Sequence, residues 1–129
     1  MKIYVVDAVA FLYYLLDKLP PKADRAFREA ENREAIIYLP TIAAAELYYL
    51  FEKKGWLKYW NLLKNKMSEY TTFEYYPFNE KILINFRKTK AKELHDKIII
   101  LTAKILKANA LITKDKELMQ LKEVNIIWK

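Results

Sequence analysis

The chain has 129 residues, of which 53% are hydrophobic, so it can bury a folded core and is not intrinsically disordered. Its net charge of +7 favours an anionic partner, which would be nucleic acid, a phosphorylated substrate or a membrane surface. Cysteine is absent, which excludes disulfides and thiolate zinc sites and fits a reducing compartment.

The sequence predicts one cytoplasmic domain over residues 1–129, with no membrane partner. No run approaches the roughly 20 apolar residues that a membrane span needs. The apolar stretch near the N-terminus is interrupted by Asp7, so it does not have the pattern of a secretion signal. Repeats, low-complexity tracts and linkers are also absent.

Short apolar segments alternate with helical patterns along the chain. The predicted strands are short apolar runs, at 2–6, 35–40, 71–78, 110–113 and 124–128. The predicted helices show apolar residues at helical spacing or many helix formers, at 8–17, 22–34, 41–55, 56–69, 79–90 and 92–109. This alternation predicts an α/β fold with three layers, in which helices flank a central parallel β-sheet.

The residue inventory excludes most catalytic mechanisms. Gly55 is the only glycine, so a dinucleotide-binding turn or a phosphate-binding P-loop is not possible. His95 is the only histidine, and Ser68 lies in a segment predicted to be an exposed helix end, which argues against a Ser–His pair. Carboxylates and lysines remain plentiful, and carboxylates select hard cations such as Mg²⁺ or Mn²⁺.

Four acidic residues stand out because each follows a predicted strand or lies on a helix face predicted to be buried. Asp7 and Asp115 follow the predicted strands 2–6 and 110–113, where function collects in parallel sheets. Glu46 is the only charge in "TIAAAELYYLF", with Thr41 as a possible cap of its helix, and is expected to point at packed surface. Asp96 opens the segment "DKIIILTAKIL" and shares its face with apolar residues.

Each of these residues also has an ordinary structural explanation. Asp7 and Asp115 could be N-caps of the helices that follow them. Asp96 could favour the first turn of its helix through the helix dipole, and Glu46 could pair with a lysine. The acids as a set point to a metal site because two lie at strand ends and two on helix faces predicted to be buried.

Four segments resemble the acidic motifs of the PIN-domain family in order and spacing. They are "YVVDAVAFLYYLL", "LPTIAAAELYYLFEK", "ELHDKIIILTAKIL" and "ALITKDKEL". The small size is similar to VapC-type toxin ribonucleases. The resemblance implies a PIN-like α/β fold and an Mg²⁺- or Mn²⁺-dependent ribonuclease with a small antitoxin protein as partner. The implied catalytic and metal residues are Asp7, Glu46, Asp96 and Asp115, with Thr113 and Glu117 in support.

The chain departs from the family pattern beside three of the acids, and at the last of them Lys114 and Lys116 flank Asp115. Ala8 and Val9 supply no polar group after Asp7, and Lys97 follows Asp96 where the family tends to have small residues. These departures support an alternative function, a PIN-like nucleic-acid-binding module with weak or no cleavage. A third reading is an α/β protein whose acids are all caps and ion pairs.

The expected substrate is RNA, attracted by basic residues near the acids. The candidate residues are Lys53, Lys54, Lys58, Arg87, Lys88, Lys90, Lys92 and Lys97. Aromatic residues Trp56, Tyr59 and Trp60 could stack on unpaired bases, but their spacing also fits a core or dimer face. The aromatic-rich segment 48–60 predicts a homodimer.

Overall fold

The computed structural model describes residues 1–129 and contains one five-stranded parallel sheet in the order β3-β2-β1-β4-β5. The strands are β1 (Lys2–Val6), β2 (Ala35–Pro40), β3 (Phe73–Tyr76), β4 (Ala110–Ile112) and β5 (Ile126–Ile127). Every strand pair is parallel, which confirms the sheet predicted from the alternating pattern.

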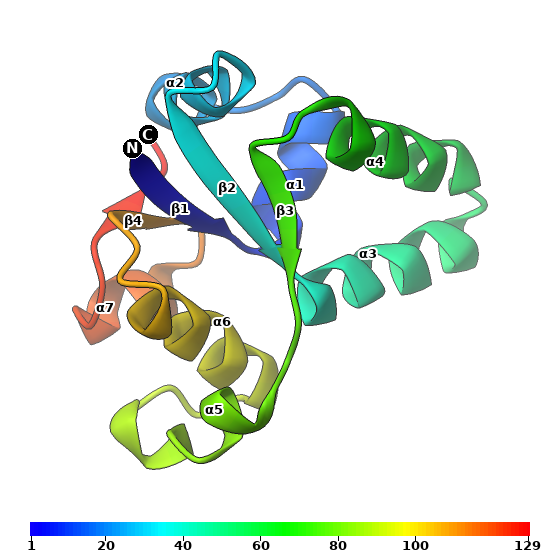
Figure 1. The fold of residues 1–129 in the computed structure, drawn as a ribbon. Helices are drawn as coiled ribbons and strands as arrows, with labels where there is room; N and C mark the ends of the chain where they lie inside the picture. The colour runs from blue at the N-terminus through cyan, green and yellow to red at the C-terminus, as the bar shows by residue number, and fades with distance from the viewer.

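Helices cover both faces of this sheet and complete the predicted three layers (Figure 1). They are α1 (Ala8–Leu15), α2 (Pro21–Glu31), α3 (Thr41–Lys54), α4 (Leu57–Glu69), α5 (Glu80–Leu83), α6 (Leu94–Ile105) and α7 (Lys116–Leu121), with a 3₁₀ turn at Phe86–Lys88. Helices α1, α2 and α4 pack on one side, and α5 and α6 lie on the other (Figure 1). None of the helices has the length and apolar character that crossing a membrane requires.

An aromatic cluster holds the α1, α2 and β3 side together. Phe11, Tyr14, Phe27 and Phe73 pack mainly edge to face, and the Tyr14 and Phe27 rings stack at 4.2 Å between centroids. Such aromatic pairs stabilise a core beyond the area they bury. These residues belong to one cluster of 27 buried side chains that extends across the sheet to α6.

The predicted helices at 79–90 and 92–109 differ most in length from the helices of the structure. The segment 79–90 contains only α5, which Asn79 caps at its start, and the 3₁₀ turn. Where α5 ends, the Asn85 side chain donates to the Lys81 carbonyl. Helix α6 ends at Ile105, and Lys107 turns the chain away with a positive φ of 52°.

The prediction for the start of α3 is wrong, and the prediction for its end is confirmed. Thr41 is not its N-cap: β2 runs directly into α3, Pro40 occupies the cap position, and no side-chain hydrogen bond is made there. Gly55 ends the helix as predicted, with a φ of 73° that a residue without a Cβ adopts at no steric cost.

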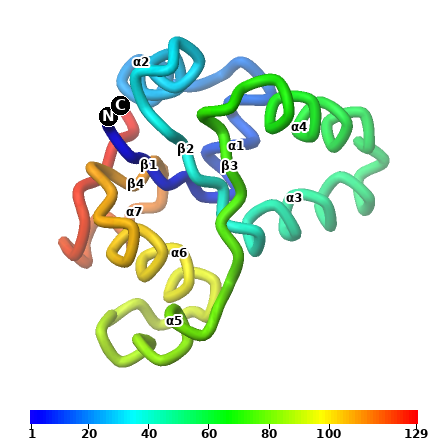
Figure 2. Tube along the Cα trace, in the orientation of Figure 1, coloured from blue at the N-terminus to red at the C-terminus, as the bar shows by residue number.

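The strand order places β1 beside β4, although more than 100 residues separate them (Figure 2). The chain moves from β1 to β2 and β3 on one side, then returns to β4 and β5 on the other. The carboxyl ends of β1 and β4 therefore form the switch point at which parallel sheets place their sites.

Candidate functional site

Asp7 and Asp115 both lie at the switch point between β1 and β4. Asp7 directly follows β1, and its backbone N–H donates to the Ile112 carbonyl of β4 at 3.2 Å. Asp115 stands three residues beyond the end of β4. The prediction that strand ends far apart in sequence bring these two acids together is consistent with this geometry.

Thr113 connects the two aspartates. Its hydroxyl donates to Oδ2 of Asp7, and the same oxygen accepts the backbone N–H of Asp115 at 3.0 Å. The Thr113 side chain is fully buried. Its position is consistent with the supporting role that the family resemblance implies, because it binds the Asp7 carboxylate and the backbone of Asp115 at once.

Both aspartates are also helix N-caps, which confirms the ordinary structural explanation of their positions. Oδ1 of Asp7 accepts the Ala10 N–H at 2.9 Å and caps α1. Oδ1 of Asp115 accepts the N–H groups of Glu117 and Leu118 at 2.8 and 3.4 Å and caps α7. Capping thus fixes one oxygen of each carboxylate and sets the direction of the other.

Burial raises the pKa of Asp7 to about 6. The hydrogen bonds from Thr113 and Ala10 oppose this rise, while the charges of Asp115 and Glu46 add to it. No lysine or arginine forms an ion pair with Asp7. This carboxyl is therefore held close to other acids without a neutralising partner.

The pKa of Asp96 is raised in the same way as that of Asp7. It lies half-buried in the first turn of α6, and burial raises its pKa to about 6. Smaller contributions come from the negative charges of Asp115, Glu93, Glu117 and Glu46. Asp96 therefore belongs to the same field of acidic charge as the strand-end aspartates.

Glu46 is less buried than its apolar sequence context predicts. Its side chain is 38% exposed and forms an ion pair with His95, with Oε2 and Nδ1 3.3 Å apart. The expectation that Glu46 points at packed surface is wrong, because α3 buries the stripe of Ala43, Leu47 and Phe51 instead. Its partner is the histidine rather than the lysine considered from the sequence.

The donor set suits a hard divalent cation in its chemistry, since it consists of carboxylate oxygens whose charges destabilise one another. In the side-chain positions of the structure, however, no group of three or more acidic or histidine side chains is close enough to hold a metal ion. Oxygens of Asp7 and Asp115 accept protein hydrogen bonds, and Glu46 faces His95. Metal binding would require side-chain rotation, above all at Glu46.

Two neighbours of Asp96 are not among the residues predicted from the sequence to form the site. Glu93 and His95 both lie in the motif "ELHDK", one at the N-cap of α6 and one paired to Glu46. Their closeness in sequence to Asp96 was the available signal. Glu117 is exposed and contributes by its charge on Asp96 rather than by contact.

Two lysines beside the acids are engaged by other groups. The ammonium of Lys97 donates to the Ala91 carbonyl, so the expectation that Lys97 attracts substrate is not supported by its position. Lys114 donates to the Tyr13 hydroxyl at 2.8 Å and lies over the ring of that residue. The other basic residues expected to attract RNA have exposed side chains, at Lys53, Lys54, Lys58, Arg87, Lys88, Lys90 and Lys92.

A family model for the PIN domain matches residues 4–124. The chain belongs to the PIN-domain family. No curated protein matches the sequence significantly.

Solved structures share the fold at low sequence identity. VapBC2 from Rickettsia felis, bound to a promoter DNA fragment, has a TM-score of 0.76 and 18% identity, covering 98% of this chain and 99% of that chain. VapBC-1 from nontypeable Haemophilus influenzae has a TM-score of 0.65 and 17% identity, covering 97% and 96%. A toxin–antitoxin complex from Klebsiella pneumoniae has a TM-score of 0.64 and 19% identity, covering 96% and 95%.

Proposed function

We propose that this PIN-domain protein is a ribonuclease that depends on Mg²⁺ or Mn²⁺ and acts as the toxin of a toxin–antitoxin pair. The observation that supports the proposal is a group of acidic side chains near the switch point of the sheet that have no basic partner. Asp7, Asp96 and Asp115 have no lysine or arginine partner, and the pKa values of the first two are raised to about 6.

Asp7 and Asp115 are the most direct ligands in this proposal, and Glu46 and Asp96 would hold a second ion or orient water. A bound cation would lower the pKa of water and offset charge on the phosphate that is attacked. Thr113 orients Asp7 by hydrogen bonding, and N-capping of α1 and α7 keeps both strand-end aspartates in place. Neutral carboxyl groups must lose their protons before they can serve as ligands.

The activity is tested with a labelled single-stranded RNA in the presence of Mg²⁺ or Mn²⁺ and, separately, of EDTA. We expect cleavage only with the cation and a loss of at least about a hundredfold in Asp7→Asn and Asp115→Asn, since each removes a charged ligand. Asp17→Asn is the matched control, because Asp17 is exposed, lies outside the site, and has a positive φ that asparagine tolerates. RNA binding without cleavage at any cation concentration would instead favour the binding module.

The toxin assignment is supported by the fold neighbours, three of which are described as VapBC or toxin–antitoxin structures. Induced expression in bacteria should arrest growth, and Asp7→Asn should relieve the arrest. Co-expression of the protein encoded next to this chain should also restore growth and give a complex that co-purifies. Growth arrest that persists in Asp7→Asn would contradict a toxin that acts through the proposed site.

A further inference from the structure

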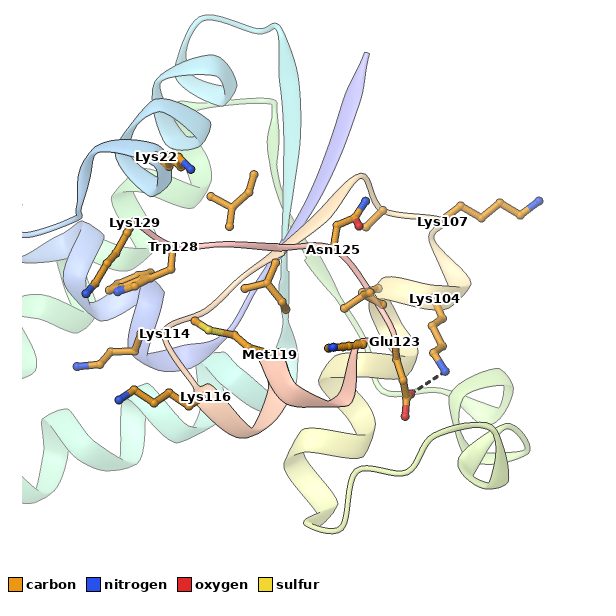
Figure 3. Close-up of a pocket in the computed structure, with 16 residues that line it drawn as sticks. Lys22, Lys104, Lys107, Lys114, Lys116, Met119, Glu123, Asn125, Trp128 and Lys129 are labelled. Carbon is orange, nitrogen blue, oxygen red and sulfur yellow. Dashed lines mark ion pairs between the residues drawn. The ribbon is translucent and has the colours of Figure 1, made fainter.

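A broad cleft of about 1510 Å³ lies along the β5 edge of the sheet (Figure 3). Lysines reach it from α2, from the end of α6 and from both sides of α7. Lys22 stands on one side of β5, and Lys104 and Lys107 stand at the far end (Figure 3). Lys114 and Lys116 mark the end nearest α7 (Figure 3).

Most of the excess positive charge of the chain lies in this cleft. Its lining contains one of the 16 acidic residues and seven of the 23 basic residues, which are the five lysines above together with Lys122 and Lys129. The rest of the chain therefore has 16 basic and 15 acidic residues and is nearly neutral. The one acid, Glu123, is already paired with Lys104 at 2.7 Å. A cleft with this charge attracts a polyanion.

We propose that this lysine cleft binds the phosphodiester backbone of single-stranded RNA and leads the strand to the acidic site. The inference rests on the proposed ribonuclease function, which it extends by naming the substrate path. Lys114 and Lys116 belong to the cleft lining and flank Asp115 in the chain, so the basic surface begins at the candidate active site. From there it continues along β5 toward Lys107.

The floor of the cleft also suits unpaired bases. It contains Trp128, Ile126 and Met119, and the Trp128 ring is half-buried against Tyr13 at 5.4 Å between centroids. An aromatic face within a basic groove is the arrangement by which proteins bind single strands with little sequence preference. Duplex RNA would not expose its bases to this floor.

An acidic peptide added as a sixth strand is the less favoured occupant. Strand β5 has only two residues, and the Trp128 carbonyl next to it already accepts the Ala23 N–H at 3.1 Å. Little free backbone remains for strand addition, whereas phosphates need only the lysine charges.

The test measures binding of a fluorescein-labelled oligouridylate to the full chain in EDTA, which prevents cleavage. The cleft variant Lys107→Gln/Lys122→Gln/Lys129→Gln is compared with Lys18→Gln/Lys64→Gln/Lys81→Gln, which removes the same charge from exposed positions outside the cleft. We expect the cleft variant to bind at least about fivefold more weakly, with a salt dependence shallower by about 2, from about 0.7 per lost phosphate contact. The control should bind as the wild type does.

Equal binding by the two variants, or no RNA binding by the wild type, would overturn the inference. Lysine-dependent binding of polyglutamate, with RNA binding unaffected by the cleft variant, would overturn it in favour of an acidic peptide. Because edge lysines also hinder aggregation, each variant is first shown to be monodisperse. Cleavage of RNA is assayed separately with Mn²⁺. If the cleft variant binds RNA more weakly but the wild type does not cleave it, the inference is supported and only the proposed activity is contradicted. If the wild type cleaves RNA but the cleft variant binds it as strongly, only the inference is contradicted.

Discussion

The hydroxyl of Thr113 donates to Oδ2 of Asp7, although 106 positions separate the two residues in the chain. The same hydroxyl oxygen accepts the Asp115 backbone N–H at 3.0 Å. One buried hydroxyl group therefore sets the positions of both strand-end aspartates. These two aspartates are held in place in this way, whereas Glu46 is paired with His95 and would have to rotate to join them.

Thr113→Val tests this arrangement, since valine keeps the shape and removes the oxygen. We expect a loss of about 1–3 kcal/mol in the free energy of unfolding, because the Asp7 carboxylate and the Asp115 N–H both lose a partner. The pKa of Asp7 should also rise above about 6, since the hydroxyl hydrogen bond favours the ionised form. Urea unfolding and an NMR titration of the carboxyl carbons measure the two effects.

Thr102→Val is the matched control. Thr102 is fully buried as well, but its hydroxyl donates to the Ile98 carbonyl of its own helix at 2.7 Å and makes no hydrogen bond to Asp7 or Asp115. This variant should leave the titration of Asp7 unchanged. An unchanged Asp7 titration in Thr113→Val would show that the hydroxyl does not tune the site.

Asp7 should make the folded chain less stable as the pH rises. Its pKa is about 6 in the fold against an ordinary value of 3.8, so between about pH 4 and pH 6 the unfolded chain loses this proton first. Asp7→Asn removes the ionisation and keeps an oxygen that can cap α1. We expect this variant to exceed the wild type by about 2 kcal/mol at about pH 8 and to show no such gain near pH 4, measured by urea unfolding.

Asp17→Asn serves as the control for this comparison, because Asp17 is exposed and stands outside the acidic field. An Asp7→Asn gain of equal size at both pH values would mean that the carboxyl is not strained by its surroundings. A gain confined to the higher pH would mark Asp7 as a residue kept at a cost in stability, as functional sites often require.

The general architecture follows from local patterns and could be predicted from the sequence. Short apolar runs alternating with helical periodicity predict a parallel sheet between helices, and the structure confirms this. The positions of Asp7 and Asp115 just beyond β1 and β4 then follow, since parallel strands share one carboxyl edge. The role of both aspartates as N-caps could also be predicted from the sequence, because capping depends only on neighbouring residues.

The surroundings of Glu46 could not be predicted in this way. Periodicity tells which residues share a helix face, but α3 has apolar residues on several faces, and Tyr49 is 66% exposed while Ala43 is buried. Which stripe meets the core depends on how α3 packs against other helices. For the same reason the sequence did not reveal that His95, which is distant from Glu46 in the chain, would pair with it.

The lysine cleft is also a property of tertiary structure. Its lysines come from α2, the end of α6, both sides of α7 and the C-terminal segment. No local run of basic residues in the sequence predicts such a cleft. The lysines predicted from the sequence to attract RNA lie near the acids in the chain, and one of them, Lys97, has its ammonium bound to a backbone carbonyl. Charge that is spread along the chain becomes a patch only when the β5 edge brings it together.

Cation uptake should depend on pH through the same carboxyl groups. Asp7 and Asp96 have pKa values raised to about 6, so a divalent cation must displace protons at lower pH. We expect Mn²⁺ to bind several-fold more tightly at about pH 7.5 than at about pH 5.5, and to raise the melting temperature because it binds the folded chain alone. Titration calorimetry measures the affinity, and thermal unfolding measures the melting temperature. Asp115→Asn should weaken Mn²⁺ binding, and the control Asp17→Asn should not. An affinity for Mn²⁺ that does not change with pH would contradict ligation by these acids.

Exposed side chains near the α3–α4 turn should mediate a homodimer. Helices α3 and α4 form a hairpin that projects from the sheet (Figure 1), and near its turn Tyr49 is 66% and Leu57 is 45% exposed. Exposed apolar groups gathered on one projection are typical of a protein interface. Tyr49→Ser/Leu57→Ser should weaken self-association in sedimentation equilibrium by at least about tenfold, since both side chains would lose buried contact. The control is Ile84→Ser, at an exposed apolar position just beyond α5, and it should leave the self-association unchanged. Equal effects of the two variants, or a monomeric wild type, would contradict a dimer through this hairpin.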